Sequence, residues 1–230
     1  MHHRCVKQNP VGDRIRGTQL YYNPNTTHQS WRSCTGCVLQ YGRRRVCLRY
    51  DGIRSYRNEK APRILFIGEA PGTTENATGV PFSGHSGRIL TQIFDYTRTA
   101  FQILITNLVC CQPKNIILPD FGNIDSVEQF DRIEANKKVL EFEEINREPN
   151  RLEIISCASH ITELEKEYRP QGIVFLGLVA KKAKISSNCP TLSLLHPAAI
   201  AREEYKVLPM KKEARKLERF IRDIRESTNN

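Results

Sequence analysis

Short, continuous apolar runs recur along this chain and predict strands. Residues 63–68 (RILFIG), 101–109 (FQILITNLV) and 172–176 (GIVFL) are apolar at almost every position. Continuous runs of this length are typical of strands that are buried on both faces of a parallel sheet. Residues 191–195 predict a fourth strand of the same kind.

Between these runs, apolar residues recur at helical spacing. Three stretches carry the pattern: residues 86–96, 154–168 and 209–226. Strands that alternate with helices indicate parallel strands joined by helical crossovers. The expected fold is therefore α/β: a three-layer α/β/α sandwich with a central, mostly parallel four-stranded sheet.

Two segments depart from this alternation. Residues 1–33 are polar, rich in turn signals and without a clear period, and predict an irregular N-terminal extension. Residues 34–230 are expected to form a single domain, with an insert at about 115–145 in which acidic residues outnumber basic ones. An acidic insert in a basic chain is expected to point away from phosphates or to contact a protein partner.

Composition narrows the class of protein. The chain has 230 residues, of which 39% are hydrophobic and 26% charged, as in ordinary globular proteins. Its longest apolar run, residues 172–180, is too short to span a bilayer, and the first twenty residues lack the apolar stretch of a signal peptide. We expect an intracellular protein without a membrane partner. The net charge of +10 and the pI near 9.3 favour nucleic acid as a partner.

A glycine-rich loop follows the first predicted strand. It reads Gly68-Glu69-Ala70-Pro71-Gly72, and a second glycine-flanked loop at 79–84 contains Phe82. The loop is neither a Walker motif nor a dinucleotide fingerprint, whereas Phe82 is free to stack on a planar ligand. Asn107 and His196 also follow predicted strands, and ligands of parallel sheets bind at the carboxyl ends of the strands.

Eight cysteines are many for an intracellular chain and suggest metal ligation before disulfides. Cys34 and Cys37 form a C-x-x-C pair. Such a pair with two distant cysteines is competent to hold an iron–sulfur cluster or zinc. On spacing alone, Cys47 would instead suggest a local zinc knuckle.

Four motifs in order resemble those of the family 4 uracil-DNA glycosylases. Residues 64–90 (ILFIGEAPGTTENATGVPFSGHSGRIL) are similar to the family's first motif, and Ile105-Thr106-Asn107 followed by Cys111 to its second. Residues 146–157 match the pattern N-R-x-P-x-x-x-E-x-x-x-C, and residues 196–199 (HPAA) match the last motif. The acidic insert and the N-terminal extension depart from the family's usual pattern.

The resemblance implies an enzyme that flips uracil out of DNA and reads it in a pocket. Phe82 is expected to stack on the base, and Asn107 to donate to O4 and accept from N3–H, a pattern that cytosine reverses. The loop residues Gly68, Ala70 and Pro71 are expected to line the pocket, and backbone amides of the 68–72 loop are expected to assist.

Cleavage of the N-glycosidic bond puts negative charge on the departing base and positive charge on the sugar. The resemblance makes His196 the donor to O2 of the leaving uracil. Glu69 and Glu75 are the available carboxylates, and we expect Glu69 to shape the pocket and Glu75 to stabilise the cation or position water.

The resemblance also assigns four cysteine ligands to a structural [4Fe–4S] cluster: Cys34, Cys37, Cys111 and Cys157. Cys110 adjoins Cys111 and is an alternative to it, as is Cys47.

The predicted protein is therefore a monomeric, intracellular glycosylase from a prokaryote or phage that acts on uracil-containing DNA and leaves an abasic site. One alternative is an enzyme for another deaminated or modified base. Another is a non-catalytic DNA-binding or replication-accessory protein that docks partners through its insert.

Overall fold

The computed structural model describes residues 39, 46, 48–53, 61–117, 143–183, 187–203 and 206–229. The N-terminal extension and most of the acidic insert, and with them Cys34, Cys37 and Cys47, lie outside the described residues. The described chain divides into two compact units. One comprises residues 113–148, and the other comprises the chain on either side of them.

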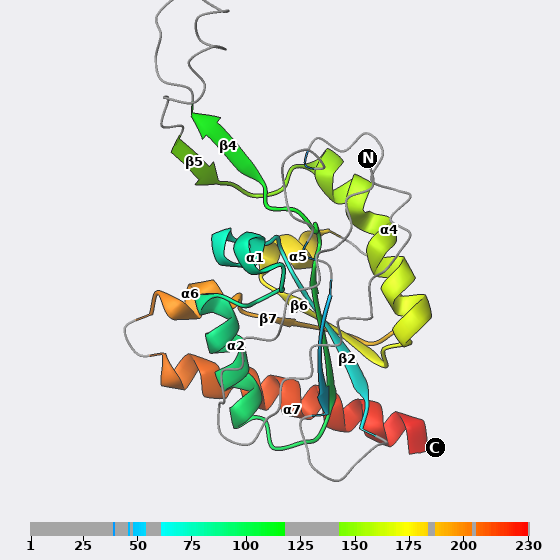
Figure 1. The fold of residues 1–230 in the computed structure, drawn as a ribbon. Helices are drawn as coiled ribbons and strands as arrows, with labels where there is room; N and C mark the ends of the chain where they lie inside the picture. Colours follow the sequence, from blue (N-terminus) through cyan, green and yellow to red (C-terminus); the bar gives the residue numbers. More distant parts are fainter. Residues whose placement is uncertain are drawn as a thin grey trace, which may run out of the picture. The chain divides into compact units, whose positions relative to one another are not determined.

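The larger unit is a layered α/β structure (Figure 1). Its strands are β1 (Arg49–Ile53), β2 (Arg63–Gly68), β3 (Gln102–Asn107), β6 (Gly172–Leu176) and β7 (Thr191–Leu194). Its helices are α1 (Thr73–Thr78), α2 (His85–Tyr96), α4 (Arg151–Tyr168), α5 (Leu178–Lys182), α6 (Pro197–Ala201) and α7 (Val207–Asn229).

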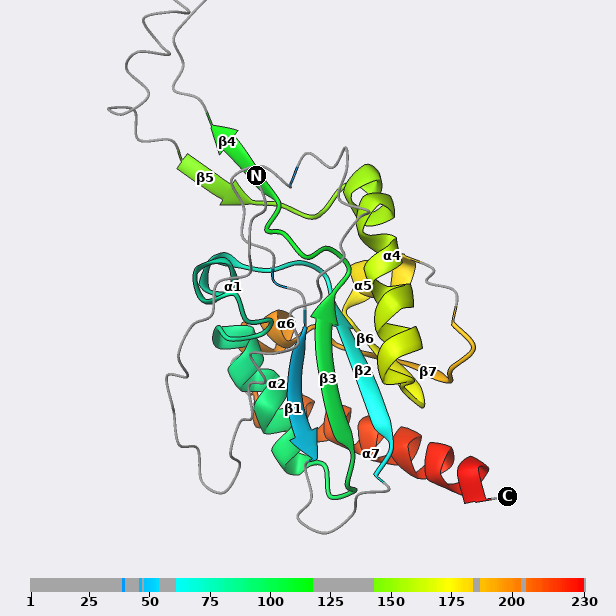
Figure 2. The ribbon, with the colours of Figure 1, turned by 45° about the vertical axis from the view of Figure 1, so that its right-hand side comes forward.

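The strands form one sheet in the order β1-β3-β2-β6-β7. The last four are parallel, which confirms the four predicted strands and the α/β fold. A fifth strand, β1, was not predicted; it pairs antiparallel with β3 at the edge of the sheet (Figure 2). Its sequence, RYDGI, has neither a continuous apolar run nor clean alternation, so the pattern carried no strand signal.

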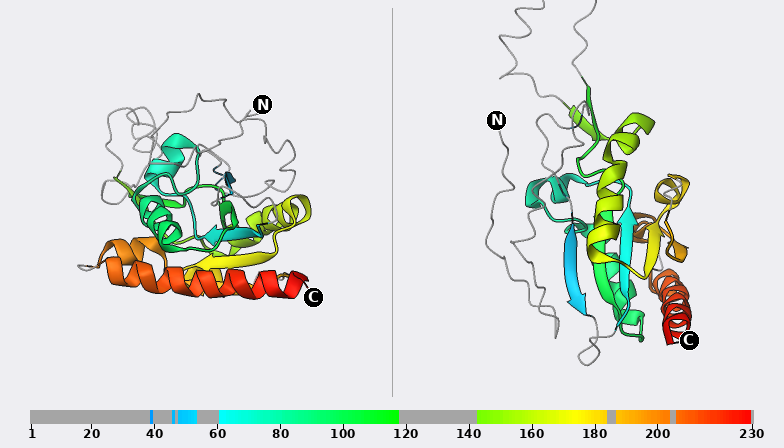
Figure 3. Two further views of the ribbon diagram at one scale, coloured as in Figure 1. Left: turned by 90° about the horizontal axis from the view of Figure 1, so that it is seen from below. Right: turned by 90° about the vertical axis from the view of Figure 1, so that its right-hand side faces the viewer.

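Helices cover both faces of the sheet, as the three-layer prediction requires. On one face, α2 and α7 pack against alternate residues of the parallel strands. The first part of α7 lies against α2 and α6, and its later part lies against the strands (Figure 3). On the other face, α4 and α5 bury the residues in between. This division follows from the strand geometry, because successive side chains point to opposite faces.

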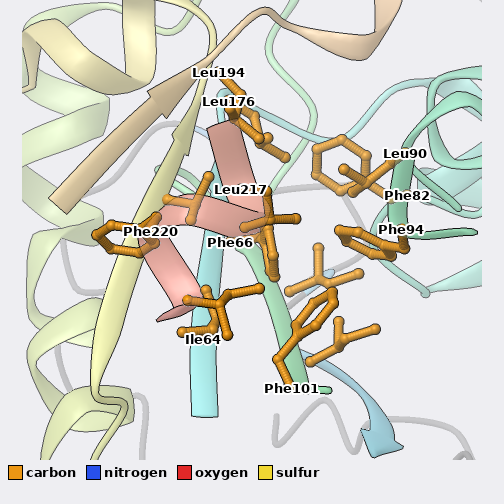
Figure 4. Close-up of a cluster of buried hydrophobic side chains, with 14 of the residues drawn as sticks. Ile64, Phe66, Phe82, Leu90, Phe94, Phe101, Leu176, Leu194, Leu217 and Phe220 are labelled. Atoms are coloured by element: carbon orange, nitrogen blue, oxygen red, sulfur yellow. The ribbon is translucent and has the colours of Figure 1, made fainter. Parts of the chain in front are cut away.

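Aromatic side chains fill the core between the sheet and α2 (Figure 4). Phe66 on β2 is fully buried, and its ring centroid lies 4.8 Å from that of Phe94 and 6.0 Å from that of Phe101. Further along the same face, α7 comes so close to β6 that a Cβ on Gly172 would lie 2.6 Å from Ile224 Cδ1. Tight contacts of this kind fix the position of α7 against the sheet.

The smaller unit contains a two-stranded antiparallel ribbon of β4 (Lys114–Ile117) and β5 (Glu143–Asn146). The residues between these strands lie outside the described part of the chain. The proposed role of this segment in binding a protein partner therefore stays a prediction.

Truncation of the aromatic core tests this packing. We expect Phe66→Ala to lower the free energy of unfolding by about 3–5 kcal/mol, because it removes a fully buried ring and leaves a cavity. Chemical denaturation with a matched control, Leu152→Ala, measures the effect; Leu152 is 74% exposed, so its removal should change stability by less than about 0.5 kcal/mol. Equal effects of the two changes would contradict the described core.

Candidate functional site

The carboxyl ends of the parallel strands bring the predicted pocket residues together. The register of β2 and β3 places Gly68 beside Asn107, the last residue of each strand. The backbone continues this pairing, since Leu108 N–H donates to Gly68 O at 2.9 Å and Val109 N–H to Glu69 O at 3.3 Å. The start of the glycine-rich loop is thus fixed against the residues that follow Asn107.

Gly68 is the point at which two candidate base-binding side chains converge. A Cβ placed on Gly68 would collide with Asn107 Oδ1 and would lie only 2.6 Å from Phe82 Cζ. Both side chains are almost completely buried, with exposed fractions of 2% for Asn107 and 6% for Phe82. The close approach requires glycine at position 68.

Phe82 holds an unusual backbone conformation, with φ of 53°, which non-glycine residues seldom adopt. A second glycine, Gly87 on α2, lies so close to this loop that a Cβ there would collide with Phe82 O. The ring of Phe82 lies 6.3 Å from the ring of His196, centroid to centroid. The aromatic ring therefore lies near both Asn107 and His196.

His196 caps helix α6 with its own imidazole. Its Nδ1 accepts a hydrogen bond from Ala198 N–H at 3.1 Å. Burial, and to a smaller extent the positive charge of Arg202, lowers the pKa of His196, so the neutral ring is favoured. A neutral imidazole that accepts at Nδ1 carries its proton on Nε2. His196 is thus prepared to donate from Nε2.

Gly177, directly after β6, lies against the side chain of His196. Its φ of +93° lies in the region that favours glycine, and a Cβ there would lie 2.9 Å from His196 Cβ and 3.3 Å from Cδ2. Sequence reasoning did not assign a role to Gly177, although its place directly after a buried strand could have indicated a position near the site.

Glu75 joins the two glycine-rich loops. Its Oε2 accepts from Gly72 N–H at 3.1 Å and its Oε1 from Gly84 N–H at 2.8 Å. Gly72 and Gly84 are the N-caps of α1 and α2, and neither has a side chain to cap its helix. One carboxylate therefore ties together the loops that carry Glu69 and Phe82, while Glu69 itself is half-buried.

The loop residues Ala70 and Pro71 follow Glu69, with Pro71 buried and Ala70 half-buried. Their place in the loop is the one expected, and their contact with a base stays a prediction.

A group of candidate metal ligands lies between β3 and α4. The ligand atoms of Cys110, Cys157 and His160 lie within 4.8 Å of one another, and all three residues are buried. Cys111 is also buried and packs against Leu39, which follows Cys37 by two positions in the sequence. Buried thiolates that face one another suit zinc or an iron–sulfur cluster, so the donor set fits a metal centre.

His160 is a member of this group that sequence reasoning missed. Burial lowers its pKa to about 4, against the opposing effect of hydrogen bonds to the backbone of Cys157 and Asn107. Its Nδ1 pairs with Cys157 O and its Nε2 with Thr106 Oγ1 at 3.3 Å. In the neutral ring, the proton on Nδ1 is donated to the carbonyl, and Nε2 accepts from the hydroxyl. Its position one turn after Cys157 on a predicted helix could have indicated that the two side chains lie on the same face.

Comparison with known proteins shows the family of this chain. The family model described as the uracil DNA glycosylase superfamily matches residues 55–225. The chain belongs to the uracil DNA glycosylase superfamily. The expected superfamily is thereby confirmed, and the matched region contains Gly68, Phe82, Asn107 and His196.

The individual proteins that this chain resembles include type-4 uracil-DNA glycosylases. The chain is 30% identical to the enzyme of Saccharolobus solfataricus over 148 residues, which cover 64% of the chain and 51% of that enzyme. It is 26% identical to the enzyme of Pyrobaculum aerophilum over 157 residues, which cover 68% of the chain and 61% of that enzyme. A shorter match, 33% over 85 residues, covers 36% of the chain and 41% of the Thermotoga maritima enzyme. The chain thus spans about half to three fifths of the length of the first two.

Within the described residues, no helix is both long and apolar enough to cross a membrane.

The bridging role of Glu75 is testable without an activity assay. In Glu75→Ala, amide hydrogen exchange at Gly72 and Gly84 should speed up by about tenfold or more, since a hydrogen bond to a charged acceptor contributes about 1.5–3 kcal/mol. Glu226→Ala, at an exposed position on α7, is the control and should leave both amides unchanged. Unchanged exchange in Glu75→Ala would show that the carboxylate does not hold these loops.

Proposed function

We propose that this protein is a uracil-DNA glycosylase that hydrolyses the bond between uracil N1 and the deoxyribose C1′ and leaves an abasic site. The observation that carries this function is the convergence of Phe82 and Asn107 at Gly68, with His196 beside Phe82. Membership of the superfamily and the type-4 relatives support it.

Recognition of the base combines stacking with an edge-on hydrogen-bond pair. Phe82 stacks on the flipped ring, and the Asn107 amide donates to O4 and accepts from N3–H. Cytosine has a donor at position 4 and an acceptor at N3, so it opposes the amide at both atoms. The buried position of Asn107 supports this selectivity, because an unmatched polar group without water is costly.

Bond cleavage leaves the electron pair of the C1′–N1 bond on uracil, where much of it resides on O2. The Nε2–H group of neutral His196 donates to O2 and stabilises this charge as it develops. The backbone amides of the 68–72 loop assist, and Ala70 and Pro71 line the pocket. A water molecule then adds to C1′, and one of its protons neutralises the uracil anion, so that the products are uracil and the abasic sugar.

The carboxylates of Glu69 and Glu75 have different roles. Glu69 shapes the pocket beside Gly68. Glu75 holds the two loops through the Gly72 and Gly84 amides, and its negative charge favours the cationic sugar or positions the attacking water. Lys and Arg side chains bind the DNA phosphates, so that binding weakens with salt.

A [4Fe–4S] cluster is the metal centre that we assign to the cysteines, with Cys34, Cys37, Cys111 and Cys157 as its ligands. When bound, it supplies structural cross-linking rather than a step of base excision. The burial of Cys111 and Cys157 and the contact of Cys111 with Leu39 support this set. Cys110, which lies within reach of Cys157, is the alternative to Cys111.

An excision assay tests the proposed activity. Cluster-loaded wild type should release uracil from oligonucleotides that contain it, single-stranded or opposite guanine or adenine, and alkali then cleaves the abasic site. Gly68→Ala should reduce the rate by about 100-fold or more, since its methyl group would occupy the space of Asn107 and Phe82.

The Asn107→Ala, His196→Ala double variant controls for contaminating glycosylase and should be inactive. Cleavage by both proteins would point to a contaminant. No cleavage by the loaded wild type would refute the uracil function and favour a modified base or a non-catalytic role.

Metal analysis tests the ligand set. Cys111→Ala and Cys157→Ala should lose most of the bound iron, together with broad absorption near roughly 400 nm, because each removes a thiolate ligand. Cys189→Ala is the matched control and should keep its iron, since Cys189 Sγ donates to Pro170 O and lies outside the described group of candidate ligands. Iron loss in Cys110→Ala together with retention in Cys111→Ala would reassign the fourth ligand, and zinc in place of iron would refute the cluster.

A further inference from the structure

Helix α7 contains a fully buried carboxylate, that of Glu213, with an exposed fraction of 0%. Among the described residues, only Glu153 is another buried carboxylate, and it closes the capping box at the start of its own helix. Glu213 has no such local task, because it lies well inside α7. A buried charge is costly unless it is paired, so its contacts indicate what it does.

Glu213 is hydrogen-bonded to the segment that joins β7 to α6. Its Oε2 accepts from Leu195 N–H at 2.9 Å, and its Oε1 accepts from Lys216 Nζ at 2.7 Å. The lysine, 43% exposed, compensates the buried charge from the same helix. The bond to Leu195 is charge-assisted, which makes it stronger than a bond to a neutral acceptor.

The N–H group that Glu213 holds belongs to the peptide group between Leu194 and Leu195, one residue before the peptide group that joins Leu195 to His196. The carbonyl of that same peptide group, Leu194 O, accepts from Gly177 N–H at 3.0 Å. Both polar ends of this peptide group are therefore fixed, one by Gly177, directly after β6, and one by α7. Since β7 is the last strand of the described sheet, no further strand is available to pair with Leu195 N–H.

This peptide group lies one residue before His196 and restrains the backbone that leads to it. The ring is then held at Nδ1 by Ala198 N–H and at its Cβ and Cδ2 by Gly177. The 50% exposure of the Leu195 side chain means that packing of this leucine contributes little to the orientation. α7 also holds the segment through Leu194, which is buried in one apolar cluster with Leu217, and the hydrogen bond from Leu195 N–H to Glu213 adds a directional polar constraint.

We propose that Glu213 is a positioning residue for base excision, which holds the Leu195 N–H group and thereby directs His196 Nε2–H at the leaving base. Because it acts through His196, this role rests on the proposed function. Glu213 touches neither the base nor the sugar, and its effect is expected on the chemical step rather than on DNA binding.

Single-turnover excision with Glu213→Ala, Glu213→Gln and Glu218→Gln tests this role. Glu213→Ala should slow excision by about 10- to 100-fold, as expected for a misplaced donor, while the Kd for uracil-containing DNA changes by less than about twofold. Glu213→Gln keeps an acceptor oxygen for Leu195 and should recover most of the rate. Glu218→Gln, on the same helix and paired with Arg222 at 2.7 Å, should behave like the wild type.

A double-mutant comparison separates positioning from a general loss of stability. With His196 replaced by alanine, Glu213→Ala should cause little further loss, because the group that it positions is gone. Losses that multiply, or a Glu213→Ala rate equal to that of Glu218→Gln, would overturn the proposed role. Loaded wild type that releases no uracil would refute the proposed function and this role with it.

A spectroscopic readout keeps the test independent of turnover, and a leucine variant avoids the cavity that alanine would leave. In protein labelled with ¹⁵N-histidine, the imidazole signals of His196 should shift in Glu213→Leu, which offers no acceptor, and should stay close to their wild-type positions in Glu213→Gln and Glu218→Gln. Melting temperatures of the three variants are measured in parallel. Unchanged His196 signals in folded Glu213→Leu would contradict positioning by Glu213.

Discussion

The absence of a side chain at Gly68 is the constraint on which the candidate pocket depends. Parallel pairing of β2 and β3 brings Gly68 beside Asn107, and only glycine leaves room there for the Asn107 amide and the Phe82 ring together. Two further contacts hold the surrounding loops in place around Gly68. Glu75 joins the two glycine-rich loops, and Gly87 lets the Phe82 backbone lie directly against α2.

Partial burial favours the neutral form of His196, and its backbone contacts fix the direction of its ring. Desolvation lowers its pKa, and in the neutral ring the backbone donor at Ala198 selects a single tautomer. A donor that is already oriented stabilises a developing anion without reorganising during a reaction. Folding itself orders this segment, through contacts to Gly177 and to α7.

Much of the fold followed from local pattern, because buried parallel strands and amphipathic helices leave strong signals. The strand at 63–68 was predicted with its observed limits, and the helix predicted at 209–226 extends by a few residues at each end. Strand β1 was missed because its partner, β3, lies some fifty residues away and its own residues show no pattern. The motifs indicated Asn107 and His196, but periodicity cannot show that both oxygens of Glu75 accept backbone N–H groups or that Glu213 reaches Leu195. Nor can it decide which way each of two adjacent cysteines faces, and the structure places Cys110 near Cys157 and Cys111 near Leu39.

The candidate metal ligands and Asn107 are connected by one short path. Helix α4 offers Cys157 and, one turn later, His160, which bonds Thr106 immediately before Asn107. Neutral His160 can donate to Cys157 O and accept from the Thr106 hydroxyl in only one tautomer, so the two ends of the path are fixed together. A metal bound at Cys157 would restrain α4, and α4 in turn supports the end of β3 through this histidine. A cluster with no redox task would then still contribute to selectivity, because discrimination between uracil and cytosine requires a single fixed orientation of the Asn107 amide.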